Sequence, residues 1–511
     1  MKKIPILFIL TFSLLFSSVP TYAKEQKADR LWQDETVYSL MVDRFNNGDT
    51  KNDIDVNTKD PLSYVGGDFQ GVIDKLDYLK DMGFTAIRLT SIFDNTAGGY
   101  HGYWVNDFYK TDEHFGSLKT FKKLVSEAHD RELKVIIDFV ANNVSAEHPW
   151  VNDSTKQSWF HEQQDINDSN DQQELENGWV DDLPDLNQDN PEVKNYLIDA
   201  ARWWINNTDI DGYSLPEVNH VPVGFWSDFS KAVKKEKENF FLIGVGSQTH
   251  TGEWEKYENA GIDSIFDYSH SDKLREVFAG TDKSLQSLEA NGEKNIFQHP
   301  ELMANFFDNE NTVRFTSDIV DQKMFPGSRW RTALAYLYST PGIPMVFYGS
   351  EIALNGGEIP DNHGLMNFRT EKELIDYITK LGELRNQLPS LTRGTMDMLY
   401  DKDGMVVYKR SFQDETSIIA INNTSKSQNV TLTKEDIEAG KELRGLLKGD
   451  LVRSEEDQYD IIIDRDEAEY YVLAKKSGLN LPLVGSLVVV FLLAIAFIIL
   501  IKNRSKRNGE V

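Results

Sequence analysis

The sequence predicts an α/β fold, a (β/α)8 TIM barrel followed by a small all-β domain. Eight short apolar runs recur within residues 24–393, and most of them are followed by an amphipathic helical pattern. Such runs are typical of parallel strands that are covered on both faces, and eight strand–helix units over about 350 residues suggest a closed barrel. Residues 394–474 contain short strand patterns alone, which predicts a separate β domain.

The expected elements can be placed along the chain. The eight barrel strands are expected at VYSLMV (37–42), AIRLT (86–90), KVIIDFV (134–140), DGYSL (211–215), NFFLIG (239–244), DSIFDY (263–268), ANFFD (304–308) and PMVFY (344–348). Helices are expected over 69–83, 117–133 and 191–207. Residues 141–190 are rich in Asn and Asp and show no clear helix, so we expect a subdomain inserted after the third strand.

The two ends of the chain predict its location. Residues 1–23 combine two lysines, an apolar run and an end with a small residue suited to cleavage, which is typical of a secretory signal peptide. Residues 481–501 carry no charge, and as a helix they would span roughly 30 Å, the thickness of a bilayer core. Basic residues follow within 502–511. A single transmembrane helix is therefore expected, with the body outside the cell membrane and residues 502–511 in the cytoplasm.

Composition excludes some functions. The 511-residue chain has no cysteine, so disulfides, Cys-ligated zinc and thiol chemistry are excluded. Its formal net charge is −28, which argues against binding nucleic acid, because phosphates would be repelled.

The loop after the first expected strand is rich in oxygen donors. DRFNNGDTKND (43–53) and GGDFQG (66–71) contain Asn47, Asp49, Asn52, Asp53 and Asp68. Calcium prefers six to eight such oxygens. Spacing alone also fits a polar turn without metal.

Several long motifs occur together in one order: DRFNNGDTKND, GGDFQG, YHGYWVNDF (100–108), DFVANN (138–143), IDGYSLPEVNH (210–220), FLIGVG (241–246), FFDNENTVRF (306–315) and PGIPMVFYGSE (341–351). With these motifs the chain resembles the alpha-amylase family, glycoside hydrolase family 13, and especially its calcium-containing, maltodextrin-acting members. The resemblance extends from about Val37 into the β domain. It implies a retaining mechanism with a carboxylate nucleophile and a Glu acid/base, about 5 Å apart.

The residues at the family's reactive positions are replaced. The resemblance puts the nucleophile at Pro216, its companion Arg at Ser214, the acid/base at Val245 and a third carboxylate at Asn311. None of these side chains can perform the chemistry of the residue that it replaces. The catalytic set is therefore expected to be empty.

Other positions of the pocket keep polar groups. Two further family histidines correspond to Glu310 and Asn143, whereas His101, Tyr103 and Asp138 remain as binding or shaping groups. The expected carbohydrate-binding set is His101, Tyr103, Asp138, Glu310 and Asn311.

The metal positions, unlike the reactive ones, match the family. The resemblance implies structural calcium held at Asn47, Asp49, Asn52, Asp53, Gly66 and Asp68, and at Asn142, Asp185 and the carbonyl of His220. Retention of the scaffold without the reactive centre suggests a pseudoenzyme.

Three functions follow from this pattern. The leading hypothesis is a membrane-anchored protein that binds an α-glucan, such as maltodextrin, or a related carbohydrate without cutting it. The first alternative is a scaffold or chaperone for another membrane protein. The second is a glycoside hydrolase on α-1,4-glucans with an active site rebuilt around Glu310 and Asp138.

Overall fold

The computed structural model describes residues 30–168, 170–180, 182–246, 254–285, 288, 297–476 and 481–507. The expected signal peptide, residues 1–23, lies outside these residues.

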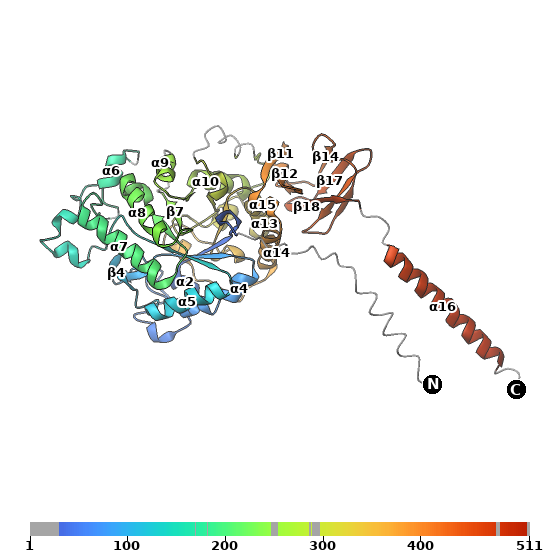
Figure 1. Ribbon diagram of the computed structural model, residues 1–511, viewed down its shortest axis with the longest axis horizontal. Helices are drawn as coiled ribbons and strands as arrows, with labels where there is room; N and C mark the ends of the chain where they lie inside the picture. Colours follow the sequence, from blue (N-terminus) through green and yellow to red (C-terminus); the bar gives the residue numbers. More distant parts are fainter. Residues whose placement is uncertain are drawn as a thin grey trace.

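Eight parallel strands form the closed barrel that the sequence predicted. In barrel order they are β1 (Val37–Leu40), β10 (Ile343–Phe347), β9 (Ala304–Asn305), β8 (Ser264–Phe266), β7 (Phe241–Val245), β6 (Gly212–Pro216), β5 (Lys134–Asp138) and β2 (Ala86–Leu89). Each lies within or beside one of the expected apolar runs. The (β/α)8 prediction is therefore confirmed (Figure 1).

Helices surround these strands. They are α2 (Val42–Phe45), α3 (Phe69–Ile73), α4 (Leu76–Asp81), α5 (Leu118–Asp130), α6 (Gln172–Asn177), α7 (Pro191–Thr208), α8 (Val223–Glu236), α9 (Trp254–Asn259), α10 (Tyr268–Ala279), α12 (Phe315–Asp321), α13 (Pro326–Ser339), α14 (Glu373–Gln387) and α15 (Pro389–Arg393). The helix expected over 69–83 is two helices, because Lys75 leaves the helical conformation with φ −113° and ψ 2°.

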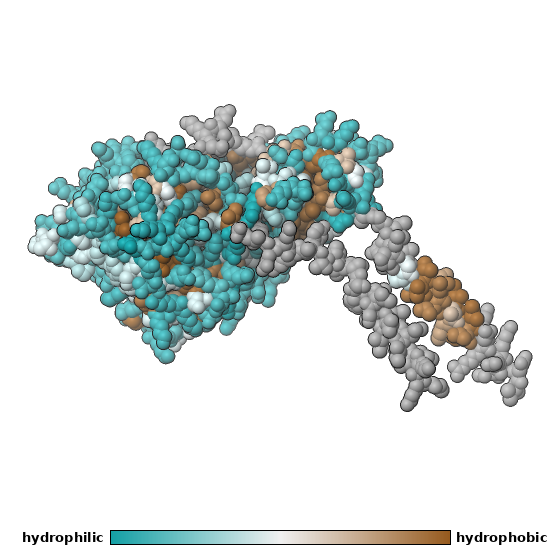
Figure 2. Space-filling model, in the orientation of Figure 1, coloured by the Kyte–Doolittle hydropathy of each residue, from teal (hydrophilic) through white to brown (hydrophobic). Residues whose placement is uncertain are grey.

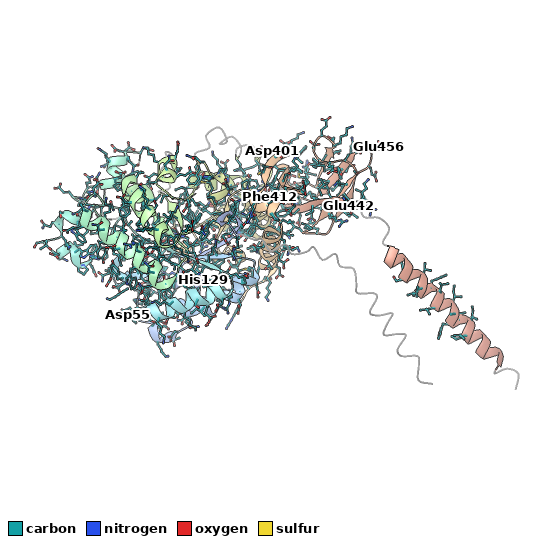
Figure 3. The ribbon with its side chains drawn as sticks, in the orientation of Figure 1. Asp55, His129, Asp401, Phe412, Glu442 and Glu456 are labelled. Atoms are coloured by element: carbon teal, nitrogen blue, oxygen red, sulfur yellow. The ribbon has the colours of Figure 1, made fainter. Side chains whose placement is uncertain are left out.

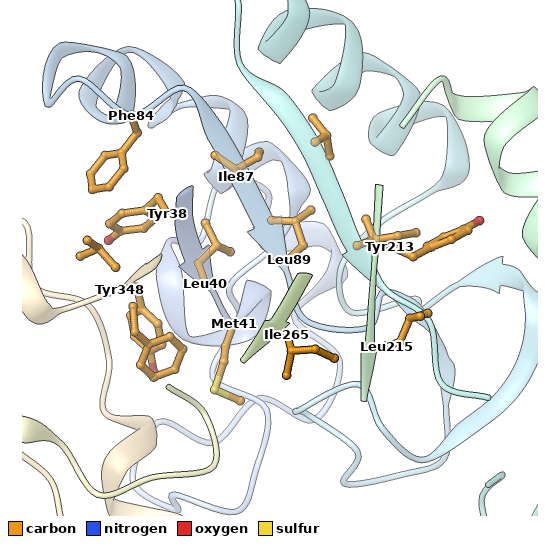
Figure 4. Packing of buried hydrophobic residues seen from close by; sticks show 14 of the residues in the cluster. Tyr38, Leu40, Met41, Phe84, Ile87, Leu89, Tyr213, Leu215, Ile265 and Tyr348 are labelled. Atoms are coloured by element: carbon orange, nitrogen blue, oxygen red, sulfur yellow. The ribbon is translucent and has the colours of Figure 1, made fainter. Parts of the chain in front are cut away.

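Strand side chains alternate between two apolar layers. Tyr38, Ile87 and Tyr213 point outward and pack under the helices in the larger core (Figure 4). Val37, Ala86 and other inward side chains fill the barrel interior as a second cluster. The barrel is therefore a packed core, and chemistry is restricted to the strand ends.

Two insertions lie between elements of the barrel. The β2–α5 connection contains the hairpin of β3 (Phe93–Asn95) and β4 (Val105–Thr111). The expected subdomain within 141–190 is mostly irregular but contains α6, whose first turn is capped by the Asp171 side chain. A helix of six residues is too short to produce a clear periodic signal in the sequence.

The β domain follows α15. Its main sheet has the order β11 (Thr395–Lys402), β12 (Met405–Phe412), β13 (Glu415–Asn422), β18 (Glu467–Lys475), β15 (Lys441–Gly445) and β16 (Leu451–Arg453). β14 (Gln428–Thr433) and β17 (Gln458–Ile463) form a second small sheet. Asp401, Phe412, Glu442 and Glu456 mark this domain in Figure 3, and Asp55 and His129 mark the barrel.

The last helix, α16 (Leu481–Arg507), includes the run for which a transmembrane helix was expected. Its apolar side chains from Leu487 to Ile501 are exposed, and they form the hydrophobic rod of Figure 2. The side chains of 481–484 and 502–507 lie outside the described set. Within the residues that are described, no helix meets the length and hydropathy needed to cross a membrane.

Candidate functional site at the mouth of the barrel

The strand ends that would carry the reactive groups carry apolar side chains. Pro216 at the end of β6 is aligned with Val245 at the end of β7, and Val245 is aligned with Phe266 at the end of β8. Val245 and Phe266 are buried in the inner cluster of the barrel. A proline ring and a valine side chain cannot attack a sugar or transfer a proton.

A buried arginine occupies the centre of the mouth. Arg88, on β2, donates from Nε to Asp138 Oδ1 (2.8 Å) and from Nη2 to Asp138 Oδ2 (2.7 Å). It also donates from Nη1 to Glu310 Oε2 (2.9 Å) and from Nη2 to Glu310 Oε1 (2.7 Å). The side chains of Arg88, Asp138 and Glu310 are 0%, 0% and 2% exposed, so this ion network is closed to water.

Two serines complete the coordination of the guanidinium. Arg88 Nε lies 3.0 Å from Ser214 Oγ, and Nη1 lies 2.9 Å from Ser39 Oγ. The guanidinium carbon also lies 5.3 Å from the centroid of the Phe266 ring, within the range of a cation–π contact. Ser214 is the position where the resemblance placed an arginine, so the positive charge comes from β2 instead of β6.

Tyr103 extends from the β3–β4 hairpin over this network. Its hydroxyl donates to Asp138 Oδ2 (2.9 Å) and lies 3.4 Å from Glu310 Oε1. The His101 ring stacks on Tyr103 with a centroid distance of 5.6 Å, and His101 Nδ1 accepts from the Tyr103 backbone N–H (3.1 Å). Four of the five expected binding residues are thus brought together, but their polar atoms contact one another and Arg88.

The two carboxyls share one cation and titrate differently. Burial is the largest effect on Asp138 and raises its pKa to about 6; the charge of Arg88 lowers this pKa, and the charge of Glu310 raises it. Burial also opposes ionisation of Glu310, but the charge and hydrogen bonds of Arg88 outweigh it and hold the pKa of Glu310 below its usual value. Burial lowers the pKa of His101 to about 3, so its ring is neutral.

The fifth expected residue, Asn311, lies at the edge of the network. Its backbone N–H donates to Asn309 Oδ1 (3.0 Å), and its side-chain amide lies 3.4 Å from the Tyr268 hydroxyl. The Glu310 carbonyl accepts from His363 Nε2 (2.8 Å), which fixes the loop that carries both residues. Glu217, which follows Pro216, lies 3.2 Å from the His220 imidazole.

Sequence reasoning missed Arg88. The signal was present, because AIRLT places a charge inside an otherwise apolar strand. A buried charge requires a partner, so Arg88 pointed to inward carboxyls on neighbouring strands.

The second expected calcium position has converging oxygens. One end of the Asn142 side-chain amide lies 3.1 Å from Asp185 Oδ1 and 3.1 Å from the His220 carbonyl oxygen. As NH2, that end donates to both oxygens, whereas a bound cation would face the amide oxygen. His161 Nδ1 lies 2.6 Å from Asp185 Oδ2, and burial raises the pKa of Asp185 to about 7. The donor set fits a hard cation.

The first expected calcium loop is only partly convergent. Asn47 Nδ2 donates to Asp53 Oδ1 (2.8 Å), and a Cβ on Gly66 would lie 2.6 Å from that amide nitrogen. Asp68 instead accepts the backbone N–H groups of Gly48, Asp49 and Gly71.

Asn52 donates to the His114 carbonyl (2.8 Å) and has a buried Oδ1 without a hydrogen-bond partner. That orphaned oxygen fits a metal ligand. No group of three or more His, Asp or Glu side chains is close enough to hold a metal in the part of the chain that the structure describes.

Comparisons with known proteins agree with this architecture. A family model described as "Alpha amylase, catalytic domain" matches residues 39–383, and one described as "Alpha-amylase C-terminal domain" matches residues 394–471. The chain belongs to the alpha-amylase family.

Similar sequences within this family have several names. The chain is 34% identical to "Beta/alpha-amylase" of Paenibacillus polymyxa over 83% of this chain, but it spans only 36% of that relative. It is 31% identical to "Intracellular maltogenic amylase" of Bacillus subtilis (strain 168), over 81% of this chain and 72% of that relative.

Solved structures in the family superpose well. An alpha-amylase from Anoxybacillus is 56% identical with a TM-score of 0.86, over 88% of this chain and all (100%) of that chain. An alpha-amylase from Geobacillus thermoleovorans, complexed with acarbose, is 53% identical with a TM-score of 0.84, over 88% of this chain and 100% of that chain. The alpha-amylase scaffold is thus kept around a mouth that contains Arg88, Pro216 and Val245.

Proposed function

We propose that this chain is a catalytically inactive alpha-amylase-family protein that binds an α-glucan or a related carbohydrate. One observation supports the loss of catalysis most strongly. Asp138 and Glu310, the carboxyls available for a rebuilt site, are both bound by the same buried guanidinium. Retaining hydrolysis needs one carboxylate free to attack and another free to transfer a proton. Carbohydrate as the ligand class is supported by the relatives, one of which is a complex with acarbose.

Hydrolysis is tested directly. The purified chain should release no reducing sugar from starch or maltodextrin above background. Turnover that disappears in both Glu310→Gln and Asp138→Asn would instead establish the rebuilt hydrolase. Absence of any maltooligosaccharide binding, together with a membrane protein that co-purifies, would establish the scaffold function.

Recovery of activity needs Arg88 to change as well. A four-residue variant would restore Arg at 214, Asp at 216, Glu at 245 and Asp at 311. The Arg at 214 would place a second guanidinium beside Arg88, since Ser214 Oγ lies 3.0 Å from Arg88 Nε. Groups that act as one catalytic unit are strongly non-additive. We therefore expect the four-residue variant to stay inactive unless Arg88→Trp, Leu or Ala is added. Activity of the four-residue variant alone would contradict the role given to Arg88.

We also propose that calcium is a structural ligand. Asn142, Asp185 and the His220 carbonyl would hold one ion, and Asn47, Asn52 and Asp53 lie where they could contribute to another. Calcium, when bound, supplies positive charge that offsets the buried carboxylate of Asp185. It would join the inserted subdomain to the β5 and β6 loops.

We further propose that residues 481–501 anchor the chain in the cell membrane with its body outside. The uninterrupted apolar sequence and the basic residues that follow it support this proposal. Full-length protein should sediment with membranes after carbonate washing, and a chain that ends at residue 476 should not. External protease on intact cells should remove the body. Protection of the body would contradict the orientation.

A further inference from the structure

A cavity lies next to the loop that carries Asn311. It measures about 460 Å³ and is lined by α10, by α12 and by the loop that carries Asn311. Ligand pockets typically measure roughly 300–1,000 Å³, so a small oligosaccharide fits. Asn311, one of the expected binding residues, lines this cavity and directly follows Glu310 of the Arg88 network in the sequence.

Arg275 lines the cavity and links the elements around it. Arg275 on α10 donates from Nε to Asp318 Oδ2 on α12 (2.8 Å) and from Nη1 to the carbonyls of Phe307 (3.1 Å) and Val313 (2.8 Å). The Arg275 residue is only 7% exposed. Its bonds tie two helices to the β9–α12 loop, so the space between them is preformed.

The walls carry both acceptors and donors. Asp272, Glu276, Asp321 and Glu358 provide carboxylates, while Lys283 and Gln322 provide donors. Lys283 Nζ is 3.8 Å from Glu276 Oε1, a loose contact that leaves hydrogen-bonding capacity on both groups. Each sugar hydroxyl both donates and accepts, and carboxylates are strong acceptors for hydroxyl donors. A neutral polyhydroxylated ligand can therefore satisfy this lining.

We propose that this cavity between α10 and α12, and not the barrel mouth, binds a neutral α-linked oligosaccharide of two or three sugar units. The inference rests on the proposed carbohydrate-binding function and names its site. It follows from the contrast between the mouth carboxyls, which are already bonded to Arg88, and an adjacent polar cavity.

Gly280 allows the cavity to be blocked without removal of a native side chain. A Cβ at Gly280 would lie 3.9 Å from Lys283 Cε and 4.0 Å from Gln322 Oε1, two of the cavity residues. Its backbone is extended, with φ −117° and ψ −176°, which any residue can adopt. Gly280→Phe should therefore fill the cavity and fold. Gly224→Phe is the matched control, because nothing lies within 4 Å of a Cβ there.

The test is calorimetric titration of the full chain with maltotriose. We expect measurable binding to the wild type, at least tenfold weaker binding to Gly280→Phe, and unchanged binding to Gly224→Phe. Equal binding to wild type and Gly280→Phe would show that the cavity is not the binding site and would leave the proposed carbohydrate-binding function intact. Absence of binding to the wild type would overturn the function itself.

If Gly280→Phe abolishes calcium binding but not maltotriose binding, the cavity is a cation site and the inference is wrong. Thermal melts of both variants show whether folding is preserved.

Discussion

At the scale of single residues, Arg88 is the central charge of the mouth. It brings one positive charge to two carboxyls, Asp138 and Glu310, and both carboxyls are buried. Charges removed from water are tolerated only when they are paired and hydrogen-bonded. Loss of the central charge should therefore cost more than loss of any surface ion pair.

Arg88→Met should destabilise the chain strongly. The substitution leaves Asp138 and Glu310 buried without their cation, and breaking a buried pair typically costs about 3–5 kcal/mol. Urea unfolding measures the loss. Arg131→Met, at a partly exposed pair with Asp77, is the control and should cost less than about 1 kcal/mol. Equal losses in the two variants would show that the network does not support the fold.

The raised pKa of Asp138 predicts a pH dependence. The folded pKa of Asp138 is about 6, which lies above the ordinary value. Its contribution to the free energy of unfolding is therefore fully present below about pH 4 and is lost as pH rises through 6. Asn at 138 does not titrate. The stability of wild type relative to Asp138→Asn should thus fall by roughly 1–3 kcal/mol between about pH 4 and pH 7. A flat difference between the two unfolding curves would rule out the shifted carboxyl.

At the scale of elements, the β3–β4 hairpin determines whether Tyr103 covers the network. Gly102 lies between His101 and Tyr103 with φ +92°, and a Cβ there would lie 2.0 Å from the Ser91 carbonyl oxygen. Such a contact cannot form without movement of backbone. The hairpin therefore requires glycine at this position for a geometric reason.

Gly102→Ala should displace the hairpin tip. Positive φ and the clash with Ser91 together should cost roughly 1–3 kcal/mol. The near-ultraviolet circular dichroism of Tyr103 and Trp104 should change as well. Gly224→Ala, in open space on α8, should leave both unchanged. A stable Gly102→Ala variant with a native spectrum would show that the hairpin is adaptable.

At the scale of the whole molecule, the expected calcium position joins three separate segments. Asn142 follows β5, Asp185 belongs to the inserted subdomain, and His220 follows β6. A ligand that binds only the folded state stabilises it by mass action. Calcium is therefore expected to act on global stability rather than on one loop.

Calcium should raise the melting temperature of the purified chain, and a chelator should lower it. A concentration one hundred times the Kd stabilises by about 2.7 kcal/mol. Asp185→Asn should reduce the calcium-dependent shift, because it removes the charged ligand beside Asn142. Asp153→Asn, an exposed residue of the same subdomain, should keep the full shift. If neither calcium nor a chelator changes the melting temperature, these loops are turns held by hydrogen bonds alone.

The sequence by itself determined the barrel and the β domain, and it predicted that reactive side chains are absent at 216 and 245. Apolar periodicity identifies covered parallel strands, and Pro216 and Val245 lack reactive atoms in any conformation. Only the tertiary structure decided which polar groups meet at the mouth. Asp138 and Glu310 lie 50 and 222 residues from Arg88 along the chain, and barrel closure brings their carboxyl oxygens within 2.7–2.9 Å of the guanidinium nitrogens. Contacts between such distant residues depend on strand register and side-chain direction, which local sequence patterns do not encode.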